Sequence, residues 1–138
     1  MGYNCSMNIT ATRTTKYTVA VLSYLQQHSH STNFQIAEAL RHEFPELSKT
    51  TVHRVTARLV EQRKIGNAPA SKDNAARFDS NVLPHDHFKC RKCDRLRDIV
   101  IPHELLEEVQ DQLGKCRIDG TVVITGLCGR CNHQDRTE

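Results

Sequence analysis

The sequence lacks any apolar stretch of the roughly 18 residues that a membrane-spanning helix needs, so we expect no membrane span. Residues 1–15 are polar and lack the apolar core of a secretory signal peptide. Internal repeats and low-complexity tracts are absent, and Gly and Pro number only 6 and 4. These absences favour an ordinary globular protein of the cytoplasm.

The sequence also lacks the arrangements of Ser, His and Asp, or of an activated Cys, that nucleophilic catalysis uses. A metal site with an open coordination position is the one remaining arrangement that could support catalysis. We therefore expect no enzyme and no small-molecule substrate.

The 138 residues are enough for one ordinary domain or two small ones. A half of about 70 residues buries too little core to be comfortably stable alone, so we expect a metal or a partner subunit. Residues 1–81 carry ten Lys and Arg against six Asp and Glu, and residues 82–138 carry nine against ten. The basic first part suits a polyanion as partner.

Two helical patterns open the chain. Apolar residues at helical spacing predict a helix over residues 17–27. Asn33 is a suitable N-cap for a second helix, which we expect to end near Glu43 because Pro45 follows.

A third helix, capped by Ser48, shows the clearest pattern. Its apolar face consists of Val52, Val55, Leu59 and Val60. Its opposite face carries Lys49, Thr50, His53 and Arg54. Such a helix can enter the major groove of DNA, which admits an α-helix that presents hydrogen-bonding and positive side chains.

The segment 65–79 predicts a β-hairpin with its tip at residues 69–74. Three short helices followed by a hairpin is the order of a winged helix-turn-helix domain. The alternative is a three-helix bundle with a solvated polar face.

The second part of the chain predicts strands over residues 88–92, 96–101 and 122–125. Pro102 opens a helix between them, and Gly114 ends it. One helix cannot cover both faces of such a sheet, so pairing with a second copy is expected. The fold class is α+β: a winged-helix domain over residues 1–80, a hinge over 81–84, and a small α/β dimerisation domain over 85–138.

Four cysteines form two C-x-x-C pairs in this second part: Cys90, Cys93, Cys128 and Cys131. Four thiolates at this spacing match the tetrahedral coordination of structural Zn²⁺. Disulfides or redox motifs are the alternative, which a reducing cytoplasm disfavours. Cys5 and Cys116 lie outside the pairs and are expected to be bystanders.

A second candidate metal site starts from His85 and His87, which point the same way in an extended segment. Asp79 lies just before the predicted hinge, Asp98 lies on the neighbouring strand, and His30 lies in the break between the first two predicted helices. Three imidazoles and two carboxylates suit Fe²⁺, Mn²⁺, Zn²⁺ or Ni²⁺. A pair of surface histidines without a metal is the alternative.

Five segments resemble the ferric uptake regulator family: Leu47–Arg54, Arg77–Asp79, Pro84–Cys93, Asp98–Ile99 and Thr125–Cys131. The resemblance covers about residues 13–131. It implies a homodimeric metal-dependent repressor of double-stranded DNA, with structural zinc on the four paired cysteines. It also implies a regulatory ion, Fe²⁺ or Mn²⁺, on His30, Asp79, His85, His87 and Asp98.

Two aspartates in the regulatory set are similar to the peroxide-sensing branch, in which Fe²⁺ reacts with hydrogen peroxide and a ligand histidine is oxidised. By that analogy His30 and His85 are the oxidised residues. A regulator of iron, manganese or zinc uptake is one alternative, and a metal-storage or redox protein that binds no DNA is another. His53 replaces the family's usual Tyr, which puts the operator sequence in doubt.

The mechanism we expect is an ion that joins His30 of the first domain to the second domain. It would hold the two reading helices of the dimer about 34 Å apart, the spacing of successive major grooves. Thr50 and Arg54 would read bases, and His53 could contact bases or phosphates. The expected phosphate contacts are Arg13, Lys16 and Lys49.

Overall fold

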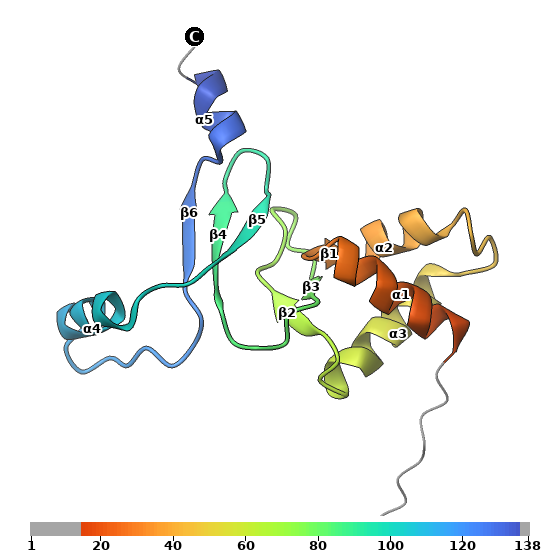
Figure 1. Ribbon diagram of the computed structural model, residues 1–138, viewed down its shortest axis with the longest axis horizontal. Helices are drawn as coiled ribbons and strands as arrows, with labels where there is room; N and C mark the ends of the chain where they lie inside the picture. The colour runs from red at the N-terminus through yellow and green to blue at the C-terminus, as the bar shows by residue number, and fades with distance from the viewer. Residues whose placement is uncertain (1–14, 136–138) are drawn as a thin grey trace, which may run out of the picture.

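The computed structural model describes residues 15–135, which form two small sheets with helices at both ends of an elongated molecule (Figure 1). The helices are α1 (Lys16–Gln27), α2 (Asn33–Leu40), α3 (Lys49–Glu61), α4 (His103–Gln112) and α5 (Gly129–Asp135). The strands are β1 (Ser31–Thr32), β2 (Gly66–Ala68), β3 (Arg77–Asp79), β4 (Asp86–Cys90), β5 (Leu96–Ile99) and β6 (Val123–Gly126). None of the helices within 15–135 has the length and apolarity to cross a bilayer.

Hydroxyl side chains cap the first three helices. Ser48 accepts a hydrogen bond from the Thr51 N–H, which confirms it as the N-cap of α3. The predicted cap of α2 was wrong: Thr32 is the N-cap, and Gln35 completes a capping box with it. The side chain of Asn33 instead accepts a hydrogen bond from Thr56 Oγ1 at 2.8 Å, which ties α2 to α3.

The second helix is shorter than the sequence predicted. It ends at Leu40 rather than near Glu43, and the chain turns before it reaches Pro45. The ring of Phe44 packs edge-on against Tyr17 of α1, with 5.5 Å between centroids. This contact holds the turn between α2 and α3 against the start of α1.

The helices α1–α3 and the first sheet share one hydrophobic core. Its fully buried members are Val21, Leu25, Ile36, Val52, Leu59 and Ile65. Phe78 of β3 joins this cluster, so the hairpin packs on the helices. Because the apolar faces of all three helices meet here, the opposite face of α3 is left in solvent.

The hairpin of β2 and β3 is antiparallel, with Gly66 opposite Asp79. Strand β1, which the sequence did not predict, adds to the other side of β3 and gives the order β1-β3-β2. Three helices and this hairpin confirm the winged helix-turn-helix. The added strand places His30, which precedes it with φ +66°, beside the end of β3.

The second sheet has the order β5-β4-β6, with β5 antiparallel and β6 parallel to β4. Helix α4 connects β5 to β6 and begins one residue after Pro102. Leu113 is its C-cap, and Gly114 follows with φ +59°, a conformation that glycine adopts without strain. The short α5, which carries Cys131 and directly follows Cys128, was not predicted from the sequence.

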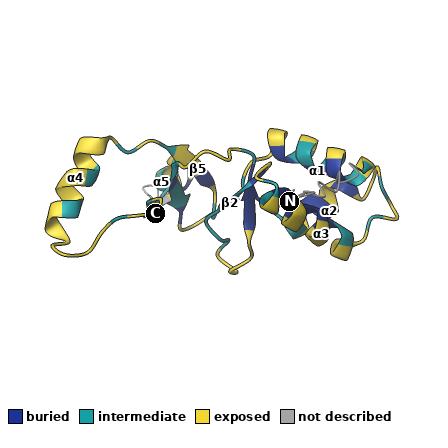
Figure 2. Ribbon diagram, turned by 90° about the horizontal axis from the view of Figure 1, so that it is seen from below, coloured by how far each residue is buried: buried dark blue, intermediate teal, exposed yellow. Residues whose placement is uncertain are grey.

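Helix α4 lies apart from the sheet that it connects, and Figure 2 shows most of its surface as exposed. No residue of α4 is buried. Its apolar side chains Leu105, Val109 and Leu113 are exposed, as are Val123 and Ile124 of β6. We call β4–β6 with α4 and α5 the second unit, and α1–α3 with β1–β3 the first unit. Within a single chain, the second unit therefore leaves apolar side chains uncovered.

We predict that Leu59→Ala lowers the free energy of unfolding by about 2–5 kcal/mol, because it leaves a cavity in the core of the first unit. Urea unfolding followed by circular dichroism measures this loss. Leu83→Ala is the matched control: its side chain is largely exposed, and a change within about 0.5 kcal/mol is expected. Equal losses in the two variants would contradict the assignment of this core.

Candidate metal centres and DNA-binding face

The four paired cysteines converge at one end of the second sheet. Cys90 ends β4, and Cys93 lies in the following turn. Cys128 directly precedes α5, and Cys131 lies in its first turn. One ligand atom from each lies within 4.8 Å of all the others. The Sγ atoms of Cys93 and Cys128 are 3.7 Å apart. This is close to the edge of about 3.8 Å expected for a tetrahedron with Zn–S bonds of about 2.3 Å.

Backbone N–H groups surround the sulfur of Cys90. The N–H groups of Cys93 and Cys128 point to its Sγ at 3.5 and 3.4 Å. These two hydrogen bonds favour the thiolate and lower the pKa of Cys90, whereas burial raises the pKa of Cys131. A cation bound to all four sulfurs would favour the thiolate form of Cys131 as well as that of Cys90. The donor set therefore fits a structural zinc ion.

The second cluster gathers five side chains from both units. His30 precedes β1, Asp79 ends β3, His85 precedes β4, and His87 and Asp98 lie opposite each other on β4 and β5. Their ligand atoms also lie within 4.8 Å of one another. The structure therefore brings together all five residues that the sequence suggested as a regulatory site.

Each of the three imidazoles directs Nε2 toward both carboxylates. The distances to Asp79 Oδ2 are 3.3, 3.0 and 3.3 Å for His30, His85 and His87. The distances to Asp98 Oδ1 are 2.7, 3.3 and 3.5 Å in the same order. Three nitrogens and two oxygens thus converge on a common point, as the ligands of one divalent ion do.

Hydrogen bonds outside the cluster orient two of these side chains. His85 Nδ1 lies 2.7 Å from the Leu83 carbonyl oxygen, which assigns the proton to Nδ1 and leaves the lone pair on Nε2. That buried Nε2 finds no hydrogen bond of acceptable geometry, although Asp79 Oδ2 is near. Asp79 Oδ1 accepts the Asn81 N–H at 2.8 Å. An unpartnered nitrogen aimed at two carboxylates fits a cation between them.

The carboxylates dominate the electrostatics of this cluster. Burial acts to raise the pKa of Asp79, but hydrogen bonds from His30 and from the Asn81 N–H hold that pKa far below its usual value. Burial acts to lower the pKa of His30, but Asp79 and Asp98 raise it overall. The pKa of His85 is also raised: burial opposes this, and the Leu83 carbonyl and Asp98 outweigh it. The two carboxylates therefore favour the positively charged forms of His30 and His85, whose pKa values are raised.

The cluster has a closed floor and a more open rim. The side chains of Asp79 and His87 are 1% and 3% exposed, whereas those of His30 and His85 are 12% and 13% exposed. Asp98 is the most accessible ligand candidate. Small molecules from solvent therefore reach His30 and His85 more readily than His87.

The polar face of α3 is exposed as the sequence predicted. Lys49, Thr50, His53 and Arg54 all lie in solvent, and Val52, Val55 and Leu59 are buried. Arg58, which the sequence analysis missed, extends this face because it follows Arg54 at helical spacing. The Lys49 Nζ lies 5.4 Å above the ring of the exposed Phe34.

Lys16 and Arg13 are the other two residues that the sequence suggested as phosphate contacts. Lys16 Nζ donates to Glu46 Oε1 at 3.0 Å, and Tyr17 Oη donates to the same oxygen at 2.9 Å. The backbone N–H of Glu46, with Lys16 and Tyr17, lowers the pKa of Glu46 to about 2. Lys16 therefore shares its charge with a carboxylate. Arg13 and Cys5 lie outside the described residues, and the exposed Cys116 belongs to neither cluster.

A winged helix joined to a small sheet, with a four-cysteine cluster and a shared His/Asp cluster, defines a metal-binding regulator of the winged-helix class. The model of the ferric uptake regulator family matches residues 7–119. The peroxide-responsive repressor PerR of Staphylococcus epidermidis is 31% identical over 135 residues, which cover 94% of this chain and 87% of that protein. The chain belongs to the ferric uptake regulator family.

Solved structures share the fold. The ferric uptake regulator from Francisella tularensis with iron superposes with a TM-score of 0.70 at 19% identity, covering 88% of this chain and 96% of that one. A zinc uptake regulator complexed with zinc and DNA gives 0.60 at 17% identity, covering 90% and 86%. Members of this family are DNA-binding regulators and not enzymes, so the chain is a metal-responsive regulator.

We predict that Cys90→Ser removes zinc from the protein and unfolds the second unit, since structural zinc contributes roughly 10–16 kcal/mol in small domains. Atomic absorption gives the zinc content, and thermal unfolding gives the stability. The control Cys116→Ser removes an exposed thiol outside the cluster and should retain both. Full zinc content in Cys90→Ser would exclude a zinc site made of all four sulfurs.

Proposed function

We propose that this protein is a dimeric repressor whose affinity for DNA depends on a divalent ion held by His30, Asp79, His85, His87 and Asp98. One observation carries the proposal: these ligand atoms converge from both units of the chain. His30 and Asp79 belong to the winged-helix unit, and the other three belong to the second unit. An ion there would fix the angle between the units.

The donor set favours Fe²⁺ or Mn²⁺ as the regulatory ion, with Zn²⁺ or Ni²⁺ also competent. The ion would supply positive charge between Asp79 and Asp98, in place of protons on the imidazoles. His85 is already oriented for this role through its Nδ1 contact with the Leu83 carbonyl. A structural Zn²⁺ on the four paired cysteines would hold the second unit together.

Dimerisation would cover the apolar surface of the second unit. Leu105, Val109 and Leu113 on α4 and Val123 and Ile124 on β6 are exposed in the single chain. A two-fold interface buries the same patch on both copies. A homodimer would thus give α4 the packing that it lacks in one copy.

In the dimer, two α3 helices would enter successive major grooves of double-stranded DNA, about 34 Å apart. Thr50, His53 and Arg54 lie on the exposed face of α3 where they can reach base edges. Arg13, Lys16 and Lys49 would contact phosphates. Lys16 would first have to leave Glu46, so its contribution to affinity is expected to be smaller.

We predict that Mn²⁺ raises the affinity of the zinc-loaded protein for duplex DNA by at least about 10-fold, equivalent to ~1.4 kcal/mol. The physical reason is that metal-free protein must order its two units at the moment of binding. Fluorescence anisotropy measures the affinity, with a duplex that the Mn²⁺-loaded protein selects from a random pool.

His87→Ala should abolish the response to Mn²⁺ while retaining zinc. The control His103→Ala, at an exposed position on α4, should respond as the wild type does. Equal DNA affinity of the wild type with and without Mn²⁺ would rule out a metal-dependent switch. A protein that stores metal and binds no DNA would show no salt-dependent affinity for any duplex.

We further propose that the regulatory ion is Fe²⁺ and that the protein responds to hydrogen peroxide. Both carboxylates of the cluster are aspartates, and the Staphylococcus epidermidis relative is named a peroxide-responsive repressor. A bound Fe²⁺ would supply the electrons that reduce hydrogen peroxide beside the ligand imidazoles. His30 and His85 are the imidazoles at the accessible rim, so oxidation is expected there and not at the buried His87.

We predict that hydrogen peroxide adds one oxygen atom to His30 or His85 in the Fe²⁺-loaded protein, and that DNA affinity falls in parallel. Peptide mass spectrometry locates the added oxygen. The Mn²⁺-loaded protein is the control and should remain unmodified. Loss of DNA affinity without histidine oxidation, or modification confined to cysteines, would argue against peroxide sensing at this site.

A further inference from the structure

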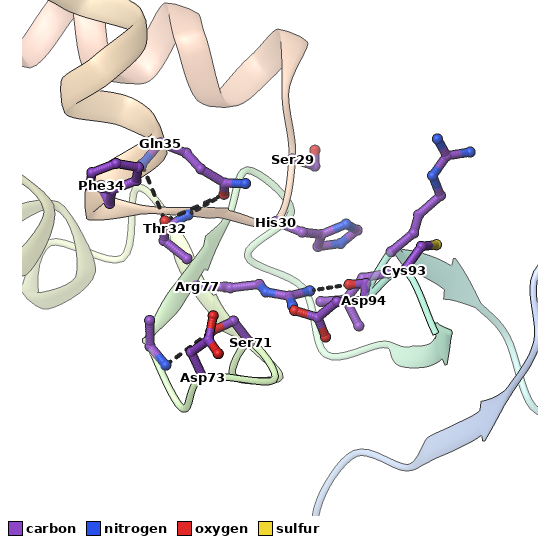
Figure 3. A pocket seen from close by; sticks show the side chains of 13 residues that line it. Ser29, His30, Thr32, Phe34, Gln35, Ser71, Asp73, Arg77, Cys93 and Asp94 are labelled. Carbon is purple, nitrogen blue, oxygen red and sulfur yellow. Dashed lines mark hydrogen bonds and ion pairs between the residues drawn. The ribbon is translucent and has the colours of Figure 1, made fainter. Parts of the chain in front are cut away.

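The wing, which is the hairpin of β2 and β3, contacts the second unit at a second place, beside His30 of the five-ligand cluster. A cleft between them is lined by Ser71, Asp73 and Arg77 from the wing and by Cys93 and Asp94 from the turn after β4. Figure 3 shows Arg77 reaching across this cleft to Asp94, with His30 beside it. Neither Arg77 nor Asp94 belongs to a candidate metal centre.

Asp94 receives hydrogen bonds from two parts of the wing. The Arg77 guanidinium makes a direct ion pair with Asp94 Oδ2 and donates a second hydrogen bond to the Asp94 carbonyl oxygen at 2.9 Å. The Lys72 N–H donates to Asp94 Oδ2 at 2.9 Å. One residue of the cysteine-bearing turn thus holds both the tip and the return strand of the wing.

A lysine of β4 strengthens the same junction. Lys89 Nζ donates to the Ala70 carbonyl oxygen at 2.8 Å and lies 3.5 Å from Asp94 Oδ1. The contacts therefore run in both directions: the wing donates to the turn, and the sheet donates to the wing.

The ion pair between Arg77 and Asp94 is largely buried. The side chains of Arg77 and Asp94 are 6% and 15% exposed. Removing one partner of a buried ion pair leaves the other charge desolvated without compensation. Opening the cleft would break this ion pair and the hydrogen bond from the Lys72 N–H, and neither contact requires an ion in the His/Asp cluster.

The strand β3 links this junction to the proposed regulatory site. Arg77 and Asp79 are two residues apart on β3, so their side chains leave the same face of the sheet. Arg77 contacts the turn at Asp94, and Asp79 faces His85 and His87. Any contact that fixes Arg77 also fixes the position from which Asp79 reaches the cluster.

We propose that Arg77 and Asp94 form a clamp, independent of the regulatory ion, that holds β3 against the second unit and so positions Asp79 for that ion. They act as positioning residues, because neither supplies a ligand. Asp94 directly follows Cys93, so the clamp also connects the wing to the four-cysteine cluster. The effect on the ion rests on the proposed function, whereas the clamp itself does not.

The test compares Asp94→Gly with the wild type and with Asp73→Asn. Asp94 has φ +64°, a conformation that glycine adopts freely, so this substitution removes the carboxylate without straining the turn. Asp73 lines the same cleft, and its carboxylate makes no ion pair with any residue among 15–135, so its amide variant controls for loss of charge. The readouts are zinc content, Mn²⁺ affinity by calorimetry, and hydrogen exchange at the Lys72 amide.

The clamp predicts that Asp94→Gly binds Mn²⁺ at least about 5-fold more weakly, with full zinc content and faster exchange at Lys72. Asp73→Asn should match the wild type in all three. Unchanged Mn²⁺ affinity in Asp94→Gly would overturn the positioning role, and so would loss of zinc, because Asp94 would then act through the cysteine cluster. If the wild type itself binds no Mn²⁺, the proposed function fails, and unchanged Lys72 exchange would show separately that the clamp is absent.

Discussion

The arrangement depends on two carboxylates that face the same three imidazoles from opposite units of the chain. At separations below 4.8 Å, two partly buried negative charges repel each other by on the order of 3 kcal/mol, and less where solvent screens Asp98. The carboxylates raise the pKa values of His30 and His85, which favours a positive charge on these imidazoles beside them. A divalent ion bound there would offset the repulsion more directly and would also require both units to stay in place. The charge balance of the cluster and the relative orientation of the two units therefore depend on each other.

The strand β3 connects the His/Asp cluster to the winged-helix unit. Its residue Phe78 packs into the core beneath α3, while its flanking residues Arg77 and Asp79 both contact the second unit. A three-residue strand thus belongs to the wing, the core and the junction at once. Because interiors are close-packed, a shift of β3 moves the helices that pack on it. This gives a physical route from the ligand cluster to the exposed face of α3.

The sequence predicted the parts that depend on local pattern. The apolar stripe and Ser48 cap of α3, the hairpin, and the spacing of the cysteines all have short-range signals, and the structure contains each of them. The resemblance to the family supplied the gathering of His30 with residues 49 to 68 positions later in the chain, which no periodicity reveals. The missed features depend on tertiary context: β1 exists because β3 lies beside it, and Thr32 replaces Asn33 as a cap because Thr56 engages Asn33. The Arg77–Asp94 contact has no sequence signal, since it joins two units through a turn with positive φ.

X-ray absorption at the manganese edge tests most directly whether one ion joins the two units. The measurement compares Mn²⁺-loaded, zinc-containing wild type with His30→Ala. An ion shared by the two units predicts outer-shell scattering from three imidazoles in the wild type. The variant should show either one imidazole fewer or loss of the bound manganese. An identical manganese shell and full occupancy in His30→Ala would place the ion within the second unit alone, where it could not govern how the winged helix is held.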